Sequence, residues 1–395
     1  MAGRSNAYRG MTLLLAALLQ NGLQIDTAFP GGNAIVEAVD GDEIRLRQDL
    51  RDTAGDWFYW QFRVRGAAGR TLTFRFTKGN VIGVLGPAVS LDGGATWAWL
   101  GKEAVDGTSF RYAFPPGSGE VRFCVSIPYL EKDLRAFLDR HRGGAFLKEE
   151  TLCASKKGRP VERLRAGRLD GTPAHRVLLT ARHHACEMIA SYVLEGVLEQ
   201  VLADDEDGRR LRETTEICAI PFVDKDGVED GDPGKNRRPR DHNRDYDGES
   251  LHPSTRALRD WVPGWADGKL RAAIDLHCPT LRGKHNETIY FVGDSDEAGW
   301  TTLESFSQTL EKIQTGPLPY RAKDNLPFGQ GWNTAQNYKQ GLSFKGWAKG
   351  LPGVRLATTL EISYANAIGV AVTADYARAF GRDLARTLRR FLDNP

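Results

Sequence analysis

Hydrophobic and polar residues alternate with a period of two over the first third of the chain. In the run Phe58–Arg65 nearly every second residue is apolar, and Leu72–Phe76 and Val121–Ile127 repeat the pattern. Successive side chains of a strand point to opposite faces, so this pattern predicts half-buried strands. Glycine-rich turns such as Asp92–Gly94 separate the runs. Short strands with such turns predict an antiparallel β-sandwich over residues 25–148.

The pattern changes at about residue 149. Val177–Thr180 is a short apolar run, and apolar residues recur at helical spacing between Glu187 and Leu202. Apolar runs that alternate with helical patterns are typical of an α/β domain with a parallel or mixed sheet. We therefore expect such a domain over residues 149–395. Further strands are expected at Ala272–Ile274, Ile289–Val292 and Leu356–Leu360, and further helices at Thr301–Ile313 and Ala374–Leu392.

Composition and charge exclude some classes of protein. The net charge of +2 gives no electrostatic reason to expect a nucleic acid partner. No apolar run reaches the ~18 residues that span a bilayer. Five scattered cysteines without CxxC pairs argue against a disulfide framework and favour a cytoplasmic location. Residues 1–24 are expected to form an N-terminal extension or a weak signal-like segment, because the apolar run Met11–Leu19 is short for a secretion signal.

Three residues that are far apart in the chain have the character of metal ligands. His184 and Glu187 are three residues apart at the start of the expected helix, and His277 ends a strand-like run. Residues three apart share a helix face, whereas Cys186 would point to a different side. Two histidines and a carboxylate, with a fourth position open to water, are the ligand set of a catalytic zinc. An isolated HxxE pair occurs by chance, so this prediction depends on the residues that accompany it.

Two further segments strengthen the prediction. The stretch from Asp224 to Asp247 is long and charged, and by itself it would be read as a solvated loop. However, α/β folds place their chemistry on loops after strands, and arginine suits both an anionic substrate group and a developing oxyanion. Glu361 ends the apolar run Leu356–Leu360, where desolvation disfavours a carboxylate. A general base that acts on a metal-bound water is a reason for a carboxylate there.

Together these motifs resemble the zinc carboxypeptidases of the carboxypeptidase A superfamily, and most closely the cytosolic carboxypeptidase-like branch. The resemblance runs from about Phe29 to the C-terminus, and Trp57–Arg63 and Ile127–Asp133 carry it in the N-terminal part. It implies an N-terminal antiparallel β-sandwich followed by a mixed-sheet α/β/α catalytic domain with one Zn²⁺ per chain. It also implies hydrolysis of the C-terminal peptide bond of peptides or protein tails by glutamate-assisted attack of zinc-bound water.

The resemblance implies roles for the residues around the metal. His184, Glu187 and His277 would bind the zinc, and Asp241 would orient a histidine ligand from behind. Glu361 would activate the water and then protonate the leaving amine.

The resemblance also implies which residues contact the substrate. Arg237 would stabilise the oxyanion, with Arg238 as a less suitable occupant of that role. Asn243 and Arg244 would hold the terminal carboxylate of the substrate.

The resemblance places the covering tyrosine and the side-chain pocket of the substrate site less firmly. The mobile tyrosine of the family has no firm counterpart; Tyr338 lies at a similar distance before the catalytic glutamate and is the best candidate, whereas Tyr364 is expected to be a wall residue. The segment Gly341–Trp347 is the expected lining of the side-chain pocket. Lys345 in it would favour acidic C-terminal residues and Phe344 apolar ones, and the sequence does not choose between them.

Two other functions fit some of these residues. A zinc-dependent deacylase of N-acyl amino acids shares the fold and the HxxE…H site, but the complete D-x-N-R motif and the sandwich favour peptide substrates. A non-catalytic peptide- or glycan-binding pseudoenzyme usually lacks a ligand or the base, and none is missing here. The expected partner is therefore the C-terminal tail of a peptide or protein. The sandwich would narrow access to the catalytic domain, so that tails enter and folded chains do not. The oligomeric state is left open by the sequence.

Overall fold

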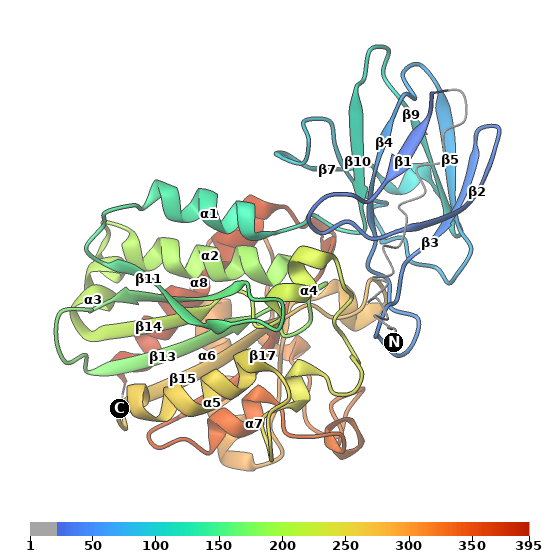
Figure 1. Ribbon diagram of the computed structural model, residues 1–395. Coiled ribbons are helices and arrows are strands. Elements are labelled where there is room, and N and C mark those ends of the chain that lie inside the picture. Colours follow the sequence, from blue (N-terminus) through green and yellow to red (C-terminus); the bar gives the residue numbers. More distant parts are fainter. Residues whose placement is uncertain (1–21, 395) are drawn as a thin grey trace, which may run out of the picture.

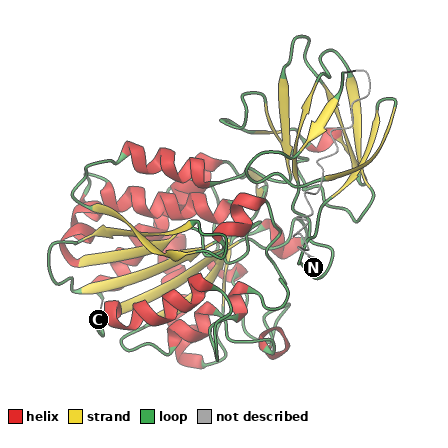
Figure 2. Cartoon of the chain, viewed as in Figure 1, coloured by secondary structure: helices red, strands yellow, loops and turns green. Residues whose placement is uncertain are grey.

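The computed structural model describes residues 22–394, which form a smaller all-β part and a larger part of strands and helices (Figure 1, Figure 2). The segment predicted as an extension or signal, residues 1–24, lies outside the described residues except for Gly22 to Gln24. The strands of the N-terminal part are β1 (Gln24–Asp26), β2 (Ile35–Asp40), β3 (Glu43–Arg47), β4 (Gln61–Arg65), β5 (Thr71–Phe76), β6 (Ala88–Ser90), β7 (Ala98–Trp99), β8 (Val105–Asp106), β9 (Ser109–Ala113) and β10 (Glu120–Cys124).

These strands form two sheets that face each other across an aromatic core. The strand orders are β1-β4-β10-β6-β7 and β2-β3-β5-β9-β8. Phe62 of β4 lies 5.3 Å from Phe74 of β5 in the other sheet, and Trp60 lies 4.7 Å from Phe76, measured between ring centroids. Such tilted aromatic pairs stabilise a core beyond their buried area. The predicted sandwich is confirmed.

One pairing in the sandwich differs from the antiparallel expectation. β3 and β5 are neighbours in the same sheet and run parallel. The chain between them crosses to the other sheet to form β4, and this crossing brings β5 back in the same direction as β3. Long-range crossings of this kind leave no mark in the local alternation, so the sequence pattern does not reveal them.

The larger part is built on a seven-stranded sheet in the order β11-β12-β14-β13-β15-β17-β16. Its four adjacent strands β14, β13, β15 and β17 are parallel, and the strands outside them are antiparallel to their neighbours, so the predicted mixed sheet is confirmed. The strands are β11 (Leu147–Ala154), β12 (Pro160–Gly167), β13 (His175–Ala181), β14 (Thr215–Ile220), β15 (Leu270–His277), β16 (Tyr290–Val292) and β17 (Leu356–Glu361), followed by the hairpin β18 (Asn366–Ala367) and β19 (Val370–Ala371).

Helices cover both faces of this sheet, with α2 and α8 on one face and α5 and α7 on the other (Figure 1). Leu178 and Leu179 of β13 accordingly belong to two separate hydrophobic clusters, which explains the continuous apolar run in this strand. The α-helices are α1 (Glu131–Arg140), α2 (Ile189–Leu202), α3 (Glu206–Thr214), α4 (Lys225–Asp230), α5 (Pro253–Ala266), α6 (Glu297–Ile313), α7 (Phe344–Lys349) and α8 (Ala374–Asp393), and the short 3₁₀ helices are η1 (Lys102–Ala104), η2 (His242–Arg244), η3 (Lys284–Glu287), η4 (Ala322–Asp324) and η5 (Ala335–Tyr338).

The segment that connects the two parts contains α1, and α1 is bonded to the larger part. Arg140 of α1 bonds Glu195 of α2 at 2.6 Å, and Arg135 bonds Glu162 of β12 at 2.9 Å. β11 begins at Leu147, so the expected division between residues 148 and 149 falls inside a strand of the larger sheet. The division of the chain into domains stays a prediction. Among residues 22–394, no helix combines the length and the apolar character that crossing a bilayer requires.

Candidate active site

His184 and Glu187 lie in a turn and not on a helix as expected. β13 ends at Ala181 and α2 begins only at Ile189. The buried guanidinium of Arg182 donates to the carbonyl of Ala185, 2.9 Å from Nε, so this carbonyl is taken by a side chain instead of by a helical N–H. The turn still brings the two side chains together, because Nδ1 of His184 lies 2.9 Å from Oε1 of Glu187.

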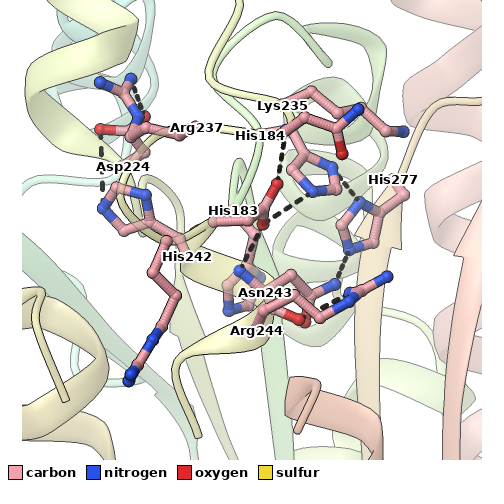
Figure 3. A network of polar contacts seen from close by, with 12 residues as sticks. His183, His184, Asp224, Lys235, Arg237, His242, Asn243, Arg244 and His277 are labelled. Carbon is pink, nitrogen blue, oxygen red and sulfur yellow. Dashed lines mark hydrogen bonds and ion pairs between the residues drawn. The ribbon is translucent and has the colours of Figure 1, made fainter. Parts of the chain in front are cut away.

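His277 completes a convergent group of three. It ends β15, and its Nδ1 lies 2.6 Å from Oε2 of Glu187 and 3.1 Å from Nδ1 of His184 (Figure 3). All three side chains are buried, and their ligand atoms are close enough together to hold one metal ion. Cys186 is not part of this group, since its Sγ is bonded by the hydroxyl of Tyr364.

Each of the two histidines contacts a carboxylate through Nε2, the ring nitrogen that does not face the metal group. Nε2 of His277 lies 2.6 Å from Oδ2 of Asp275, and Nε2 of His184 lies 3.2 Å from Oδ1 of Asp241. A histidine that donates its Nε2–H to a carboxylate keeps the lone pair of Nδ1 for a metal. Asp241 therefore makes the contact that its predicted role requires. Asp275 was missed by the sequence prediction, although the DxH spacing places it on the same strand face as His277.

Asp275 also joins the site to a buried network. Its Oδ1 lies 2.7 Å from Nδ1 of His183, whose Nε2 lies 2.7 Å from the hydroxyl of Tyr246. His183, Asp275 and His277 could by themselves hold a metal. Because Asp275 lies between two imidazole rings and bonds both, we interpret this group as support for His277.

The chemistry of the donor group fits a cation. Burial lowers the pKa of His277, but Asp275 and Glu187 outweigh this effect and raise it well above the ordinary value. The group therefore attracts positive charge, either a proton or a metal ion that displaces it. Two imidazole Nδ1 atoms that face each other at 3.1 Å cannot both carry a proton without repulsion, whereas one cation can bind both. The residues thus fit the zinc that the sequence implies.

Glu361 lies beside this group at the carboxyl edge of the sheet. It ends β17 and is paired in register with His277 of the parallel strand β15. The side chain is buried, and its Oε2 has no hydrogen-bond partner within residues 22–394. Burial raises the pKa of Glu361, although Lys235 and His277 act in the opposite direction. An unpartnered buried carboxylate oxygen is costly unless it serves a ligand.

A cavity of about 470 Å³, here called the central cavity, contains most of the predicted site residues. Its walls come from the loops after β13, β14 and β15, from the ends of β15 and β17, from the segment between α6 and α7, and from one residue of the N-terminal part, Trp57. The predicted residues that line it are His184, Asp241, Asn243, Arg244, His277, Tyr338 and Glu361.

Arg237 does not line the central cavity. Its guanidinium lies between three carboxylates, 2.7 Å from Asp52, 2.6 Å from Asp224 and 3.0 Å from Asp232. Figure 3 shows it beside Asp224 and apart from His184 and His277. This placement contradicts the predicted role of Arg237 as the oxyanion stabiliser. Arg237 and Arg238 both line another cavity, which lies at the junction of the two parts.

The cation closest to the metal group is Lys235, which the sequence prediction missed. Its Nζ lies 2.9 Å from Oε1 of Glu187 and 5.0 Å from the centroid of the Trp57 ring, and it lines the central cavity. Burial alone would lower the pKa of Lys235, but Glu187 and Glu361 raise it above the ordinary value. The sequence feature that points to Lys235 is its place two residues before Arg237 in the same charged motif.

The two residues predicted to hold a substrate carboxylate differ in how much of their hydrogen-bonding capacity the protein already uses. Both ends of the Asn243 amide have protein partners: Oδ1 accepts from the N–H of Phe344 at 2.9 Å, and Nδ2 donates to Asp275 at 3.1 Å. Asn243 thus holds Asp275 in place. Arg244 donates to two backbone carbonyls from Nε and Nη1, and its guanidinium lies 5.4 Å from the ring centroid of Tyr338.

The segment expected to line the side-chain pocket borders a second cavity of about 500 Å³, here called the side cavity. It is lined by Lys345 and shares Tyr338, Gln340 and Ser343 with the central cavity. Phe344 is fully buried in the hydrophobic cluster under α7, so it cannot shape a pocket. Tyr364 is also buried and lines neither cavity, which contradicts its expected place in the wall.

Comparisons with known proteins show which sequences this chain is similar to. The family model described as zinc carboxypeptidase matches residues 140–247. Human cytosolic carboxypeptidase 2 is 29% identical over 62% of this chain and 32% of its own length. An uncharacterized protein of Zymomonas mobilis, ZMO1242, is 31% identical over 52% of this chain and 54% of its own. The chain spans 27–33% of the length of the cytosolic carboxypeptidase 2 relatives from frog, mouse and human.

Solved structures extend the likeness to both parts of the chain. A metallo-carboxypeptidase from Burkholderia cenocepacia has a TM-score of 0.76 at 19% identity, covering 94% of this chain and 99% of that one. A metallo-carboxypeptidase from Pseudomonas aeruginosa has a TM-score of 0.70 at 22% identity with the same coverage. These matches show a shared fold that includes the N-terminal sheets. Together with the family match over residues 140–247, which includes the turn of His184 and the loop of Arg244, they show that this chain is similar to zinc carboxypeptidases in sequence over that segment and to metallo-carboxypeptidases in fold over most of its length.

Proposed function

We propose that this protein is a zinc metallocarboxypeptidase that removes the C-terminal residue of peptides or protein tails. One observation carries the proposal: Nδ1 of His184, Nδ1 of His277 and the carboxylate of Glu187 converge beside the central cavity, which is also lined by Glu361, whose Oε2 has no hydrogen-bond partner within residues 22–394. The match of residues 140–247 to the zinc carboxypeptidase family model and the names of the curated relatives support it. Zinc bound there would supply a Lewis acid and lower the pKa of a water molecule.

The other side chains of the cavity would bind the substrate and move the proton. Arg244 is oriented by two backbone carbonyls, which presents the rest of its guanidinium to a substrate carboxylate. Glu361, with a free oxygen and a raised pKa, would accept the proton of the attacking water and pass it to the leaving amine. The guanidinium of Arg244 lies over the ring of Tyr338, which lines both cavities and would close on the bound terminus.

The N-terminal part would limit the substrates that enter. Trp57 lines the central cavity, and its neighbour Phe58 packs edge-on against Tyr364 with ring centroids 5.4 Å apart. A wall supplied by a second part of the chain favours an extended tail over a folded surface. This supports protein or peptide tails as the substrate class.

The proposal is tested by hydrolysis of a peptide panel that varies only in the last residue. The zinc-loaded protein is expected to cleave peptides with a free C-terminal carboxylate and to leave their C-terminal amides intact. E361Q should lower kcat by about 10²–10⁴-fold, the usual contribution of a general base, while binding zinc in the same stoichiometry. Cleavage of N-acyl amino acids in preference to peptides would establish a deacylase instead. Peptide binding without turnover at full zinc occupancy would establish a binding protein.

A cytoplasmic location is part of the same proposal. The mouse and human relatives carry the word cytosolic in their names, and all five cysteines, which lie within the described residues, are unpaired. Fractionation of the source cells with an antibody to the protein tests it. Recovery outside the cytoplasm would contradict it.

A further inference from the structure

Two cationic side chains, Lys235 and Arg244, line the central cavity among the residues that the structure describes. The guanidinium of Arg244 lies over the ring of Tyr338. Lys235 lies at the metal group itself, since its Nζ is one hydrogen bond from Oε1 of Glu187. With Arg237 bound between three carboxylates outside the cavity, Lys235 is the cation that a reacting carbonyl group would meet.

The backbone places Lys235 at the metal group by a close approach. The preceding residue, Gly234, has a φ of +72°, and a Cβ there would come within 2.4 Å of the backbone N of Ala185. On the same side, the N–H of Cys186 bonds the carbonyl of Pro233 at 3.1 Å. Only glycine permits this contact between the loop and the turn of His184 and Glu187. The position of Lys235 therefore follows from the turn that also sets the metal group.

The N-terminal part fixes the other side of Lys235. Residues 52–54 run antiparallel to residues 236–238, with hydrogen bonds from Ala54 to Asn236 at 3.1 Å and from Arg238 to Asp52 at 3.0 Å. This pairing carries Trp57 over Lys235, where the indole ring attracts the ammonium group. The ammonium group of Lys235 thus contacts the ring of Trp57 from one part and the carboxylate of Glu187 from the other.

We propose that Lys235 is the catalytic cation that stabilises the oxyanion, in the role that the sequence had indicated for Arg237, and that Trp57 is the residue that positions it. The inference rests on the proposed carboxypeptidase activity. When the water oxygen bonds to the scissile carbon, the π electrons of the carbonyl move to its oxygen and the water proton moves to Glu361. The new negative charge then accepts a hydrogen bond from the ammonium group of Lys235. As the C–N bond breaks, those electrons return to the carbonyl and the proton leaves with the amine.

The test compares K235Q with K312Q, which removes the same charge from an exposed lysine on α6. We expect K235Q to lower kcat by about 10²–10³-fold, the usual effect of losing one oxyanion donor, with little change in KM. Binding of a phosphonate peptide, a stable tetrahedral anion, should weaken by a similar factor in calorimetry, whereas a product carboxylate should bind as before. Zinc content should stay at one per chain, and K312Q should match the wild type in every measurement.

Rescue experiments separate a chemical role from a structural one. K235R should recover part of the lost turnover, and ethylammonium added to K235A should restore some of it, because both return a cation to the same place. W57A should lower kcat by roughly twofold to tenfold, as expected for a lost cation–π contact, and W57F should recover most of it. K235R, W57A and W57F also test the role of Lys235 if K235Q does not fold.

Several outcomes would overturn the inference. Unchanged turnover and unchanged phosphonate affinity in K235Q would show that Lys235 does not meet the oxyanion. Loss of zinc from K235Q would assign Lys235 to the metal group rather than to the substrate. In both cases wild-type cleavage leaves the proposed function intact. If the wild type cleaves no peptide of the panel, the proposed function fails and this inference fails with it.

Discussion

The two sides of the segment from Asp232 to Arg244 differ in what their charged residues contact. Toward the junction of the two parts, the cation Arg237 is surrounded by carboxylates of the protein: Asp52, Asp224 and Asp232. Toward the central cavity, Lys235 forms an ion pair with Glu187, and Glu361 lines the same cavity with an Oε2 that has no hydrogen-bond partner within residues 22–394. Charges matched within the protein hold its parts together, whereas those with spare hydrogen-bonding capacity are available to a ligand.

The junction side shows how the N-terminal part is attached. Asp52 comes from that part, and Arg51 beside it forms an ion pair with Asp232. Thr53 pairs with Arg237 as an isolated bridge. The cluster therefore links backbone and side chains of both parts at the loop that carries the site residues.

The largest expected effect is on stability, from R237M. Removing one partner of a buried ion pair usually costs about 3–5 kcal/mol, because the carboxylates are left without their cation. We expect a loss of this order in the free energy of unfolding, measured by chemical denaturation, and an unchanged kcat per folded molecule. K235Q should show the opposite pattern, with stability kept and kcat lost. A stable R237M with a kcat reduced more than tenfold would return Arg237 to the catalytic site.

The fold was largely predictable because its signals are local. Alternation in Phe58–Arg65 identified the sandwich, and the continuous apolar run in β13 identified a strand buried on both faces. The parallel pairing of β3 with β5 was not predictable, since it depends on how the chain crosses between sheets. The turn at His184 was read as a helix because the spacing of three fits both, and only the bond from Arg182 to Ala185 decides between them.

The site was predictable where it follows strand ends. His277 and Glu361 end neighbouring parallel strands, so they meet at one edge of the sheet whatever the loops do. Residues of the irregular loop were not predictable in this way. Nothing in the order Lys235-Asn-Arg237 says which cation turns toward the cavity, and that choice depends on the contact of Gly234 with Ala185 and on the pairing with the N-terminal part.

A smaller effect is expected on metal affinity, and it distinguishes the two carboxylates behind the histidines. D275N and D241N should each weaken zinc binding by roughly 10–100-fold, measured by competition with a chelator, because each lowers the basicity of a histidine ligand. D275N should have the larger effect, since Asp275 lies 2.6 Å from His277 and Asp241 lies 3.2 Å from His184. Equal affinity in the wild type and D275N would remove His277 from the metal site.

The smallest expected effect concerns the side cavity and depends on pH. Burial lowers the pKa of Lys345 to about 8, and its Nζ donates to the carbonyls of Gly293 at 2.8 Å and Val292 at 3.3 Å. The unfolded chain holds this proton up to a higher pH, so the group costs stability at pH 7 and this cost disappears as pH rises above about 8. Below that pH Lys345 is charged and would attract an acidic side chain that reaches the side cavity.

The ratio of kcat/KM between peptides ending in Glu and in Leu should therefore fall as pH rises through the pKa of Lys345. A partly buried ion pair contributes roughly 1 kcal/mol, so a change of about fivefold is expected between pH 6.5 and 9.5. Taking the ratio cancels the titration of Glu361 and of the metal group, which both substrates share. K345M should show a lower ratio that does not change with pH. A wild-type ratio that stays constant over this range would mean that the C-terminal side chain does not reach Lys345, and the side cavity would then have no part in specificity.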